Sequence, residues 1–508
     1  HVQGDPFASP SHVTIRIPYA VHQFPERYYQ SKETKTAFLD YLLRSFKKQA
    51  DHFSFHAKGS GKSGLLSISG CGQEMLRRTA CDLDEKQKKE LIFRFHIGFP
   101  ANGRTINAPE LEKILFDFLP VCVEKACLYR TCKKSSLQSV AELAEDQAFI
   151  RRELIQRNLA AFVADGSVLP RVSGVSDLPM KDSVPFTSPE SLRISITLPH
   201  KGQISGMGIP RGITLIVGGG YHGKSTLLKA LELGIYNHIP GDGREYVITD
   251  DTAVKLRSED GRVIKNVDIS MFINDLPNHK DTTSFSTPDA SGSTSQAAGT
   301  VESMEAGSRL FLIDEDTSAT NFMVRDTFMQ EVISRDKEPI TPFLERARDL
   351  YEKAGISTIL VAGSSGAFFH IADTVIQMDC YHPIDITASV KELCHYPISS
   401  SFPSAFSLPK SKRFFASPSK KTDYKDRKIK LRSKDVFTVG KEEVDLRYVE
   451  QLTDSEQTAT LGLLLGYAKE HFSDGRKTIP EIASLLYHEL EVNGYSGFFS
   501  GSYIPGGY

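Results

Sequence analysis

Residues 218–226 read GGGYHGKST and follow the apolar run from Ile213 to Val217. The segment satisfies the spacing G-x-x-x-x-G-K-[ST], and its flanks predict a strand before it and a helix after it. Glycines let successive backbone N–H groups turn toward phosphate oxygens, and the N-terminus of the helix adds positive partial charge. The sequence therefore predicts a phosphate-binding loop.

Each polar residue of this loop has an expected role. Lys224 is expected to reach the β and γ phosphates of ATP, and Ser225 to place its hydroxyl on Mg²⁺. Tyr221 and His222 are unusual in such a loop, and both nucleotide contact and simple surface exposure stay open for them. The predicted nucleotide-binding residues are Gly218, Gly219, Gly220, Tyr221, His222, Gly223, Lys224, Ser225 and Thr226.

A second glycine–lysine segment serves as a contrast. Residues 56–64 read HAKGSGKSG, but His56 stands where the first glycine belongs, and the β-like run LLSIS follows instead of a helix. We interpret this segment as a basic hairpin loop and not as a nucleotide site.

An acidic pair ends a predicted strand farther along the chain. Four apolar residues precede Asp314 and Glu315, and Asp314 lies 90 residues after Lys224. One carboxylate at the end of a buried strand can join the Mg²⁺ shell, and a second beside it can polarise the attacking water as a general base. We assign Asp314 to the metal and Glu315, with Lys224, to catalysis; an ordinary strand end that caps the next helix is the alternative.

The residues before the acidic pair indicate the subclass. Residues 290–307 read ASGSTSQAAGTVESMEAG, a small Ser/Gly loop entering an Ala/Glu-rich helix. This resembles the signature loop of ABC-type ATPases, usually LSGGQ, and DEDTSATN at 314–321 resembles their DEPTSALD. The resemblance implies a head-to-tail homodimer with two ATP molecules between the protomers. Its implied in-trans contacts are Ser291, Gly292, Ser293 and Gln296.

Several positions depart from the ABC pattern. The switch histidine is missing, with Gly363 or Ser364 in its place and His370 several residues late in a predicted helix. Asn274 or Asp275 would have to replace the usual glutamine of the Q-loop. An aromatic residue to stack on adenine is not evident upstream, where His200 is a candidate with a structural role as its alternative. The loss of the switch histidine puts fast hydrolysis in doubt.

A longer resemblance covers most of the chain. GMGIPRGITLIVGGGYHGKSTLLKALELGIYNH, RFHIGFPANGRTI and VDLRYVEQL are similar to the family of predicted ATPases of the ABC class. Within it, the chain is most similar to the kinetoplastid mitochondrial member associated with the RNA-editing machinery. The resemblance implies a mitochondrial location, with a targeting segment expected upstream of His1, and partners among RNA-processing proteins.

Composition and pattern set the expected organisation. The 508 residues carry a net charge of -2, so any nucleic-acid surface is local. The seven cysteines fit no zinc or disulfide pattern and indicate free thiols. An apolar run near 18 residues is lacking, so we expect no transmembrane helix. The expected fold is α/β. An ABC-type P-loop ATPase core at 190–385 is flanked by an α+β domain at 1–180, which offers a possible RNA-binding surface, and by a basic, partly helical region with a flexible tail at 386–508.

The basic character concentrates at residues 409–434, which hold eleven Lys or Arg against two Asp. Cations neutralise phosphates, and the interleaved Phe414, Phe415 and Tyr424 can stack on unpaired bases. These residues therefore favour a nucleic-acid partner, and the resemblance implies that this partner is RNA, single-stranded where the aromatic residues stack on its bases. A solvated linker, a DNA-directed repair ATPase and an ATP-gated scaffold with little turnover stay open. The candidate nucleic-acid-binding residues are Lys412, Arg413, Lys420, Lys421, Arg427, Lys428, Lys430 and Arg432.

Overall fold

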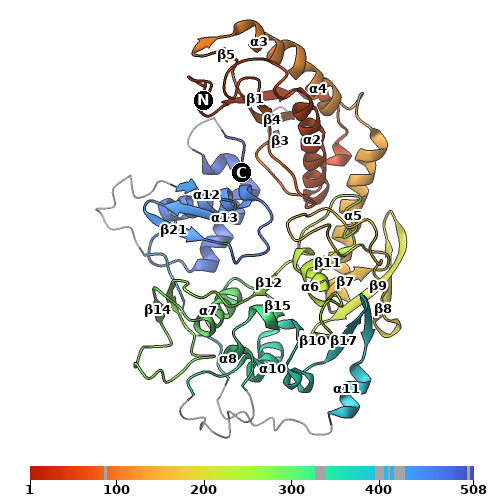
Figure 1. Cartoon of the computed structure of the whole chain (residues 1–508), viewed down its shortest axis with the longest axis vertical. Coiled ribbons are helices and arrows are strands. Elements are labelled where there is room, and N and C mark those ends of the chain that lie inside the picture. The colour runs from red at the N-terminus through yellow and green to blue at the C-terminus, as the bar shows by residue number, and fades with distance from the viewer. Residues whose placement is uncertain (85–88, 326–337, 395–405, 410–411, 417–428, 500–503) are drawn as a thin grey trace.

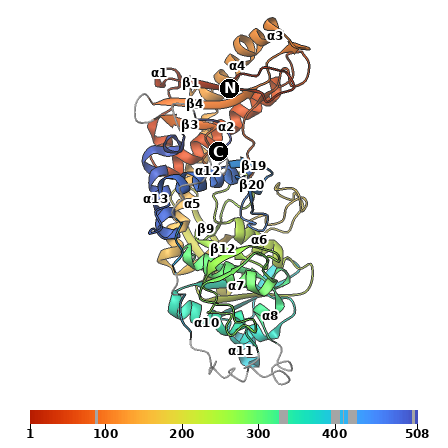
Figure 2. The same ribbon diagram turned by 90° about the vertical axis from the view of Figure 1, so that its left-hand side faces the viewer.

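The structure is a computed structural model that describes residues 1–508 except 85–88, 326–337, 395–405, 410–411, 417–428 and 500–503. The molecule is elongated (Figure 1). The N-terminal part forms one end, the core with the phosphate-binding loop forms the other, and the C-terminal helices lie between them, as the orthogonal view of Figure 2 also shows. In the described part of the chain, no helix is long and apolar enough to cross a membrane.

The N-terminal part packs one long helix on an antiparallel sheet. Strand β4 (Glu90–Ile97) pairs with β1 (Ser11–Ile17), β2 (Leu66–Ser67) and β3 (Cys81–Asp84), and β2 lies within the β-like run LLSIS. Helix α2 (Lys32–Phe53) covers this sheet. The remaining elements of this part are α1 (Tyr19–His22), η1 (Glu26–Tyr28), β5 (Ala101–Asn102), β6 (Thr105–Ile106), α3 (Ala108–Glu112), η2 (Lys113–Phe118) and α4 (Leu119–Cys127).

The core is built on a six-stranded sheet in the order β12-β15-β16-β10-β17-β18, in which only the β17–β18 pair is antiparallel. This arrangement confirms the predicted α/β core. The strands are β10 (Ile213–Val217), β12 (Ala253–Leu256), β15 (Leu310–Asp314), β16 (Ser357–Val361), β17 (Thr374–Asp379) and β18 (His382–Asp385).

Helices cover both faces of this sheet. Successive strand residues point to opposite sides, so apolar neighbours in one strand bury their side chains against different helices. In β10, Leu215 packs in the same apolar cluster as α7 (Gly292–Glu305) and α10 (Phe343–Ala354), whereas Ile216 packs in the cluster that contains α6 (Lys224–Leu233). The shorter elements of the core are β13 (Ile264–Val267), β14 (Phe285–Thr287), η4 (Glu315–Thr317), α8 (Thr320–Met323), η6 (Gly366–His370) and α11 (Thr387–Leu393).

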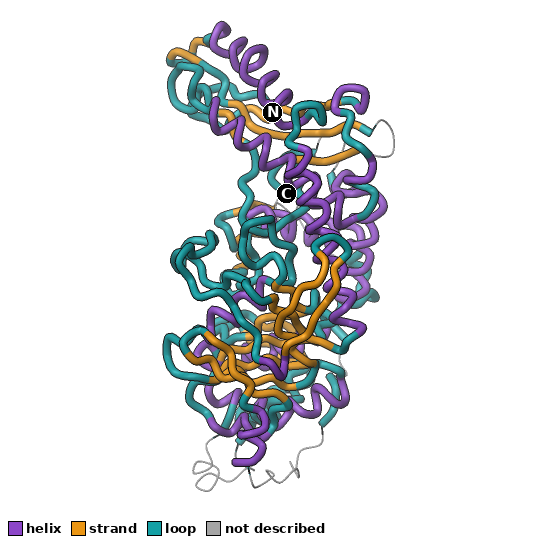
Figure 3. The backbone as a smooth tube through the Cα atoms, turned by 90° about the vertical axis from the view of Figure 1, so that its right-hand side faces the viewer, coloured by secondary structure: helices purple, strands orange, loops and turns teal. Residues whose placement is uncertain are grey.

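A second, antiparallel sheet lies beside the first, and Figure 3 shows the strands of both gathered in the lower half of the molecule. Its order is β11-β7-β9-β8. The periodicity of residues 137–163 predicts one continuous helix, which is wrong at its end, because α5 stops at Gln156 and residues 159–164 form β7. Asn158, with a φ of 54°, turns the chain out of the helix, and all six residues of β7 are buried between two strands. The elements are α5 (Lys134–Gln156), β7 (Leu159–Ala164), η3 (Glu190–Leu192), β8 (Arg193–Leu198), β9 (Gly202–Pro210) and β11 (Val247–Thr249).

The C-terminal part contacts both the core and the N-terminal part. Gln451 donates to the backbone carbonyls of Glu232 and Ala253 in the core, at 3.2 and 2.9 Å. On the other side, the buried guanidinium of Arg78 pairs with Asp454 at 2.6 Å. The elements are β19 (Ile429–Leu431), β20 (Val436–Val439), β21 (Glu442–Asp445), α12 (Ser455–His471), α13 (Ile479–Asn493) and η8 (Gly494–Phe498).

The C-terminal tail was predicted to be flexible, but its described residues pack against the rest of the protein. Tyr495 and Phe498 are buried. The backbone N–H of Tyr508 donates to Thr79 Oγ1 at 3.1 Å, and its carbonyl accepts from the Thr79 N–H at 2.7 Å. The end of the chain is therefore held by the N-terminal part.

Candidate nucleotide site

The predicted phosphate-binding loop joins the end of β10 to the start of α6. Two of its glycines have backbone conformations that L-residues avoid, with φ 138° at Gly218 and φ 96° at Gly223. Space is short as well, because a Cβ on Gly218 would lie 2.4 Å from the carbonyl oxygen of Met378. The loop curls over the N-terminus of a ten-residue helix, where free N–H groups favour an anion.

Lys224, the first residue of α6, turns back over the loop. Its Nζ donates to the carbonyl oxygens of Gly218 and Gly219 at 2.7 and 2.8 Å. These carbonyls hold the ammonium group inside the curve of the loop, where phosphate oxygens would meet it. Ser225 is exposed on the first turn of the helix, with its hydroxyl open to a ligand.

The acidic pair lies at the end of β15, which is separated from β10 by β16. Strand β15 pairs in parallel with β16, and Asp314 is in register with Val361. The segments that follow these two strands therefore meet at the same edge of the sheet. Glu315, just after β15, accepts hydrogen bonds from the N–H groups of Gly363 and Ser364 at 2.7 and 3.0 Å.

Ser364 makes a further contact to this glutamate. Its hydroxyl donates to Glu315 Oε1 at 2.8 Å, while the two backbone N–H groups bind Oε2. Burial acts to raise the pKa of Glu315, but these hydrogen bonds outweigh it and hold the pKa below its ordinary value. The carboxylate is therefore ionised and fixed in orientation, as a general base requires.

Asp314 has the opposite electrostatic character. Burial raises its pKa, and in the part of the chain that the structure describes it forms no ion pair. Asp314 Oδ1 accepts the backbone N–H of Asp316 at 3.2 Å. The carboxylate of Asp314, which has no ion pair among the described residues, and the open hydroxyl of Ser225 each offer the kind of oxygen ligand that Mg²⁺ prefers. The residues present thus fit the expected metal.

The predicted signature loop forms the N-terminus of α7. Ser291 is its N-cap and is exposed, and its side chain accepts from the N–H of Thr294. Gly292 and Ser293 follow at the first helical positions and are partly exposed. The loop therefore presents a helix N-terminus to solvent.

Gln296 has a different place from the other three predicted signature residues. It is buried, its Nε2 donates to Ser318 Oγ at 3.0 Å, and its Oε1 accepts from the Ala319 N–H at 2.8 Å. Gln296 thus connects the signature helix to the segment that follows the acidic pair. The sequence held no signal for this contact, because the two segments are separated by β15.

Other residues considered from the sequence lie apart from the loop. His200, in the turn between β8 and β9, hydrogen bonds to Glu145 of α5 through its ring. Asn274 donates to the carbonyl of Ser270 at 2.6 Å. His370 is exposed at the end of η6, and Ser364 occupies the position beside Glu315.

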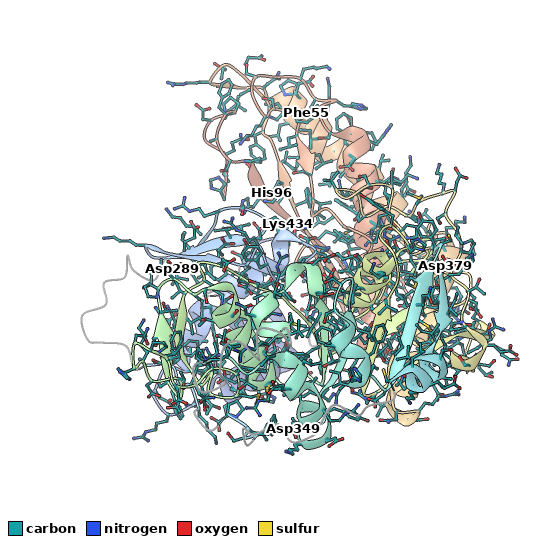
Figure 4. The ribbon with its side chains drawn as sticks, turned by 60° about the horizontal axis from the view of Figure 1, so that its bottom comes forward. Phe55, His96, Asp289, Asp349, Asp379 and Lys434 are labelled. Atoms are coloured by element: carbon teal, nitrogen blue, oxygen red, sulfur yellow. The ribbon has the colours of Figure 1, made fainter. Side chains whose placement is uncertain are left out.

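A cleft of about 1300 Å³ opens beside the loop. Its walls come from the loop itself, from residues 169–186, and from the C-terminal part, where Lys434 is labelled in Figure 4. Tyr221 and Tyr381 both line it. Neither Tyr381 nor the cleft wall at 169–186 was predicted from the sequence, because the aromatic residue was expected upstream of the loop.

The candidate nucleic-acid-binding residues divide into three groups. Lys430 and Arg432 are exposed on and after β19, and Lys412 is exposed as well. Arg413 instead pairs with Glu302 and Glu305 of α7, at 2.8 and 2.5 Å, so its charge is already engaged. Lys420, Lys421, Arg427 and Lys428 lie outside the described residues.

Known proteins similar to this chain were found by sequence and by structure. The uncharacterized protein MJ1628 of Methanocaldococcus jannaschii is 30% identical over 267 residues, which cover 49% of this chain and 57% of that protein. Among solved structures, cbiO1 from Clostridium perfringens, part of the ABC transporter complex cbiONQ, is 14% identical over 45% of this chain and 87% of its own, with a TM-score of 0.27. The ADP conformation of MJ1267, an ATP-binding cassette of an ABC transporter, is 11% identical over 48% and 96%, with a TM-score of 0.28.

Family profiles match three consecutive parts of the chain. Residues 1–130 match the N-terminal domain of ATPases of the ABC class, and residues 428–507 match the MRB1590 C-terminal domain. The P-loop domain of the ABC ATPases matches residues 133–406, more than half of the chain. Together with the P-loop fold and the motifs placed along one edge of its sheet, these matches establish that the chain belongs to the ABC-class ATPases.

Proposed function

We propose that this protein is a homodimeric ABC-type ATPase that binds and hydrolyses ATP between two protomers. ATP binding and hydrolysis are coupled to RNA binding in mitochondrial RNA processing or editing. The observation that carries the proposed hydrolysis is the fixed carboxylate of Glu315. Three hydrogen bonds hold it at the same edge of the sheet as the phosphate-binding loop.

The roles of the residues follow from their chemistry. Lys224 and the N–H groups of the loop would bind the phosphates of ATP, and Ser225 and Asp314 would hold Mg²⁺. The bound metal supplies positive charge against the phosphate oxygens. Glu315 orients and deprotonates the attacking water, and Ser364 positions Glu315.

The dimer is supported by the exposure of the signature loop. Ser291 lies at a helix N-terminus, is exposed, and caps its own helix with its side chain. A second protomer in head-to-tail orientation would place its nucleotide against this helix end, where N–H groups favour an anion.

RNA coupling is supported by charge and by the C-terminal match. Lys430 on the edge strand β19 and Arg432 just after it are exposed cations, within the region that matches the MRB1590 C-terminal domain. Arg413 links the preceding basic segment to α7, the helix that starts at the signature loop. Binding at the C-terminal part could therefore influence the helix that faces a partner's nucleotide.

A scaffold that uses ATP only to set its shape is the second candidate. The presence of Ser364 where ABC ATPases have a histidine favours it, because a serine cannot donate a proton as readily as an imidazole. Near-zero single-turnover hydrolysis together with retained ATP binding would select this alternative.

Replacing Ser364 with alanine is expected to slow single-turnover hydrolysis about 10-fold with ATP affinity retained, because one hydrogen bond to the charged carboxylate is lost. Since that bond favours the ionised form, its loss raises the pKa of Glu315. The acid side of the pH–rate profile should then move to higher pH. Ser364→Thr keeps the hydroxyl and serves as the control; an unshifted profile in Ser364→Ala would argue against the positioning role.

RNA coupling is tested by ATP turnover with and without poly-uridine RNA or duplex DNA. We expect stimulation by RNA that fades between about 50 and 200 mM salt, because phosphate contacts release counterions. Stimulation by DNA alone would select the DNA-directed alternative, and no stimulation by either would leave the scaffold.

The described cations give this test a variant. The double variant Lys430→Ala, Arg432→Ala should show a weaker dependence of log affinity for poly-uridine on log salt. Each phosphate contact contributes about 0.7 to the magnitude of this slope, so the loss of two contacts should lower it by about 1.4. Lys391→Ala, an exposed residue of α11 in the core, is the matched control. An unchanged slope in the double variant would exclude this strand from the RNA surface.

A further inference from the structure

The cleft beside the phosphate-binding loop has a side wall with no assigned role. The turn between β17 and β18 consists of Cys380 and Tyr381, and Asp379, labelled in Figure 4, is the last strand residue before it. Both turn residues have positive φ, 46° and 73°. Two-residue hairpin turns of this kind favour Asn-Gly, so a cysteine and a tyrosine here are held against their backbone preference. Strain of this sort is characteristic of functional positions.

Two hydrogen bonds connect the turn to the phosphate-binding loop. The Cys380 N–H donates to His222 Nδ1 at 3.0 Å, and the Tyr381 N–H donates to the His222 carbonyl oxygen at 3.2 Å. The ring of Tyr381 lies against Gly223, where an added Cβ would be 3.0 Å from its Cδ1. The position of the ring is therefore set by the same loop that would hold the phosphates.

The ring also has a free side. Tyr381 is 53% exposed and lines the cleft, next to Gly223 and Lys224. Among the described aromatic residues of the cleft, Phe186 is buried at 2% exposure and Tyr221 is 99% exposed. Tyr381 thus combines a packed face with an accessible one, which is the arrangement that a flat ligand can stack on.

The rest of the cleft suits a nucleoside. From the phosphate-binding side at Ser225 and Thr226, the cleft extends to the segment at residues 169–186. The apolar side chains of Leu169, Met180, Val184 and Met378 line it, alongside the charged Arg171, Asp177 and Asp182. A loop that suits phosphates, with an exposed aromatic ring and apolar side chains beside it, matches the two halves of a nucleoside triphosphate.

We propose that Tyr381 stacks on the base of the bound nucleotide, so that the β17–β18 turn supplies the aromatic contact that the upstream sequence lacks. This inference rests on the proposed ATP binding. Because every base has a π face, the stacking contact does not distinguish ATP from GTP.

The test compares ligands with and without a base by calorimetric titration of the full chain. In Tyr381→Asn, which keeps a residue tolerant of positive φ but removes the ring, affinities for ATP and GTP should both fall about 5- to 100-fold. Affinity for inorganic tripolyphosphate should stay unchanged. Tyr381→Phe keeps the ring and should bind ATP within about twofold of the natural chain. Cys380→Asn, in the same turn, should bind like the natural chain.

Three results would overturn the inference. One is an equal loss of ATP and tripolyphosphate in Tyr381→Asn, which would mean that the turn only shapes the loop. Another is no loss of ATP affinity in that variant. The third is a base-dependent loss in Tyr221→Asn instead, which would assign the stacking to the loop tyrosine. If the natural chain binds neither ATP nor tripolyphosphate, the proposed ATP binding fails first, and that outcome is distinct from the other three.

Discussion

Exchanging Glu315 for glutamine is expected to lower ATP turnover by about 10²- to 10⁴-fold, the range lost when a general base is removed. The amide has nearly the same shape and can keep hydrogen bonds with Gly363 and Ser364, so ATP affinity should be retained. Phosphate release under steady-state conditions measures the loss.

The neighbouring acidic residue offers the control for this prediction. Asp316 is exposed one position farther along, and Asp316→Asn removes a similar charge without touching the hydrogen bonds of Glu315. Asp316→Asn should hydrolyse ATP like the natural chain. Equal turnover in both variants would exclude Glu315 as the base.

Replacing Lys224 with alanine is expected to weaken ATP binding by at least about 100-fold, because the charged hydrogen bonds to two phosphates are lost. In the structure this ammonium group lies inside the loop, bound to the carbonyls of Gly218 and Gly219. Calorimetric titration with ATP measures the change.

A surface lysine of the same domain provides the reference. Lys353 of α10 pairs with Asp349 at 2.6 Å, and Lys353→Ala should leave ATP affinity as it is. Retained affinity in Lys224→Ala would contradict the assignment of residues 218–226 as the phosphate-binding loop.

The sequence predicted the parts of the site that are local in the chain. The loop at 218–226 and the acidic end of β15 each depend on a few consecutive residues, whose backbone conformation and burial follow from their own types. The strands and helices around them were predicted by the same local periodicity. Within this local range, β7 was missed because Leu159 to Ala164 carry no alternation when both faces of a strand are buried.

The missed contacts join segments that are distant in sequence. Ser364 meets Glu315 because β16 is the parallel neighbour of β15, an order that a single sequence does not reveal. Tyr381 reaches Gly223 because β17 lies next to β10. The ion pair of Arg413 could not be predicted for the same reason, because Glu302 of α7, which it contacts, is distant in the sequence.

Sedimentation velocity of the Glu315→Gln chain, with and without ATP and Mg²⁺, tests the proposed two-nucleotide sandwich most directly. With hydrolysis blocked, ATP should convert the protein to a dimer, and the further substitution Ser291→Arg, which places a bulky side chain at the exposed cap of the signature helix, should prevent this. A Glu315→Gln chain that binds ATP yet sediments as a monomer at saturating nucleotide would contradict the sandwich.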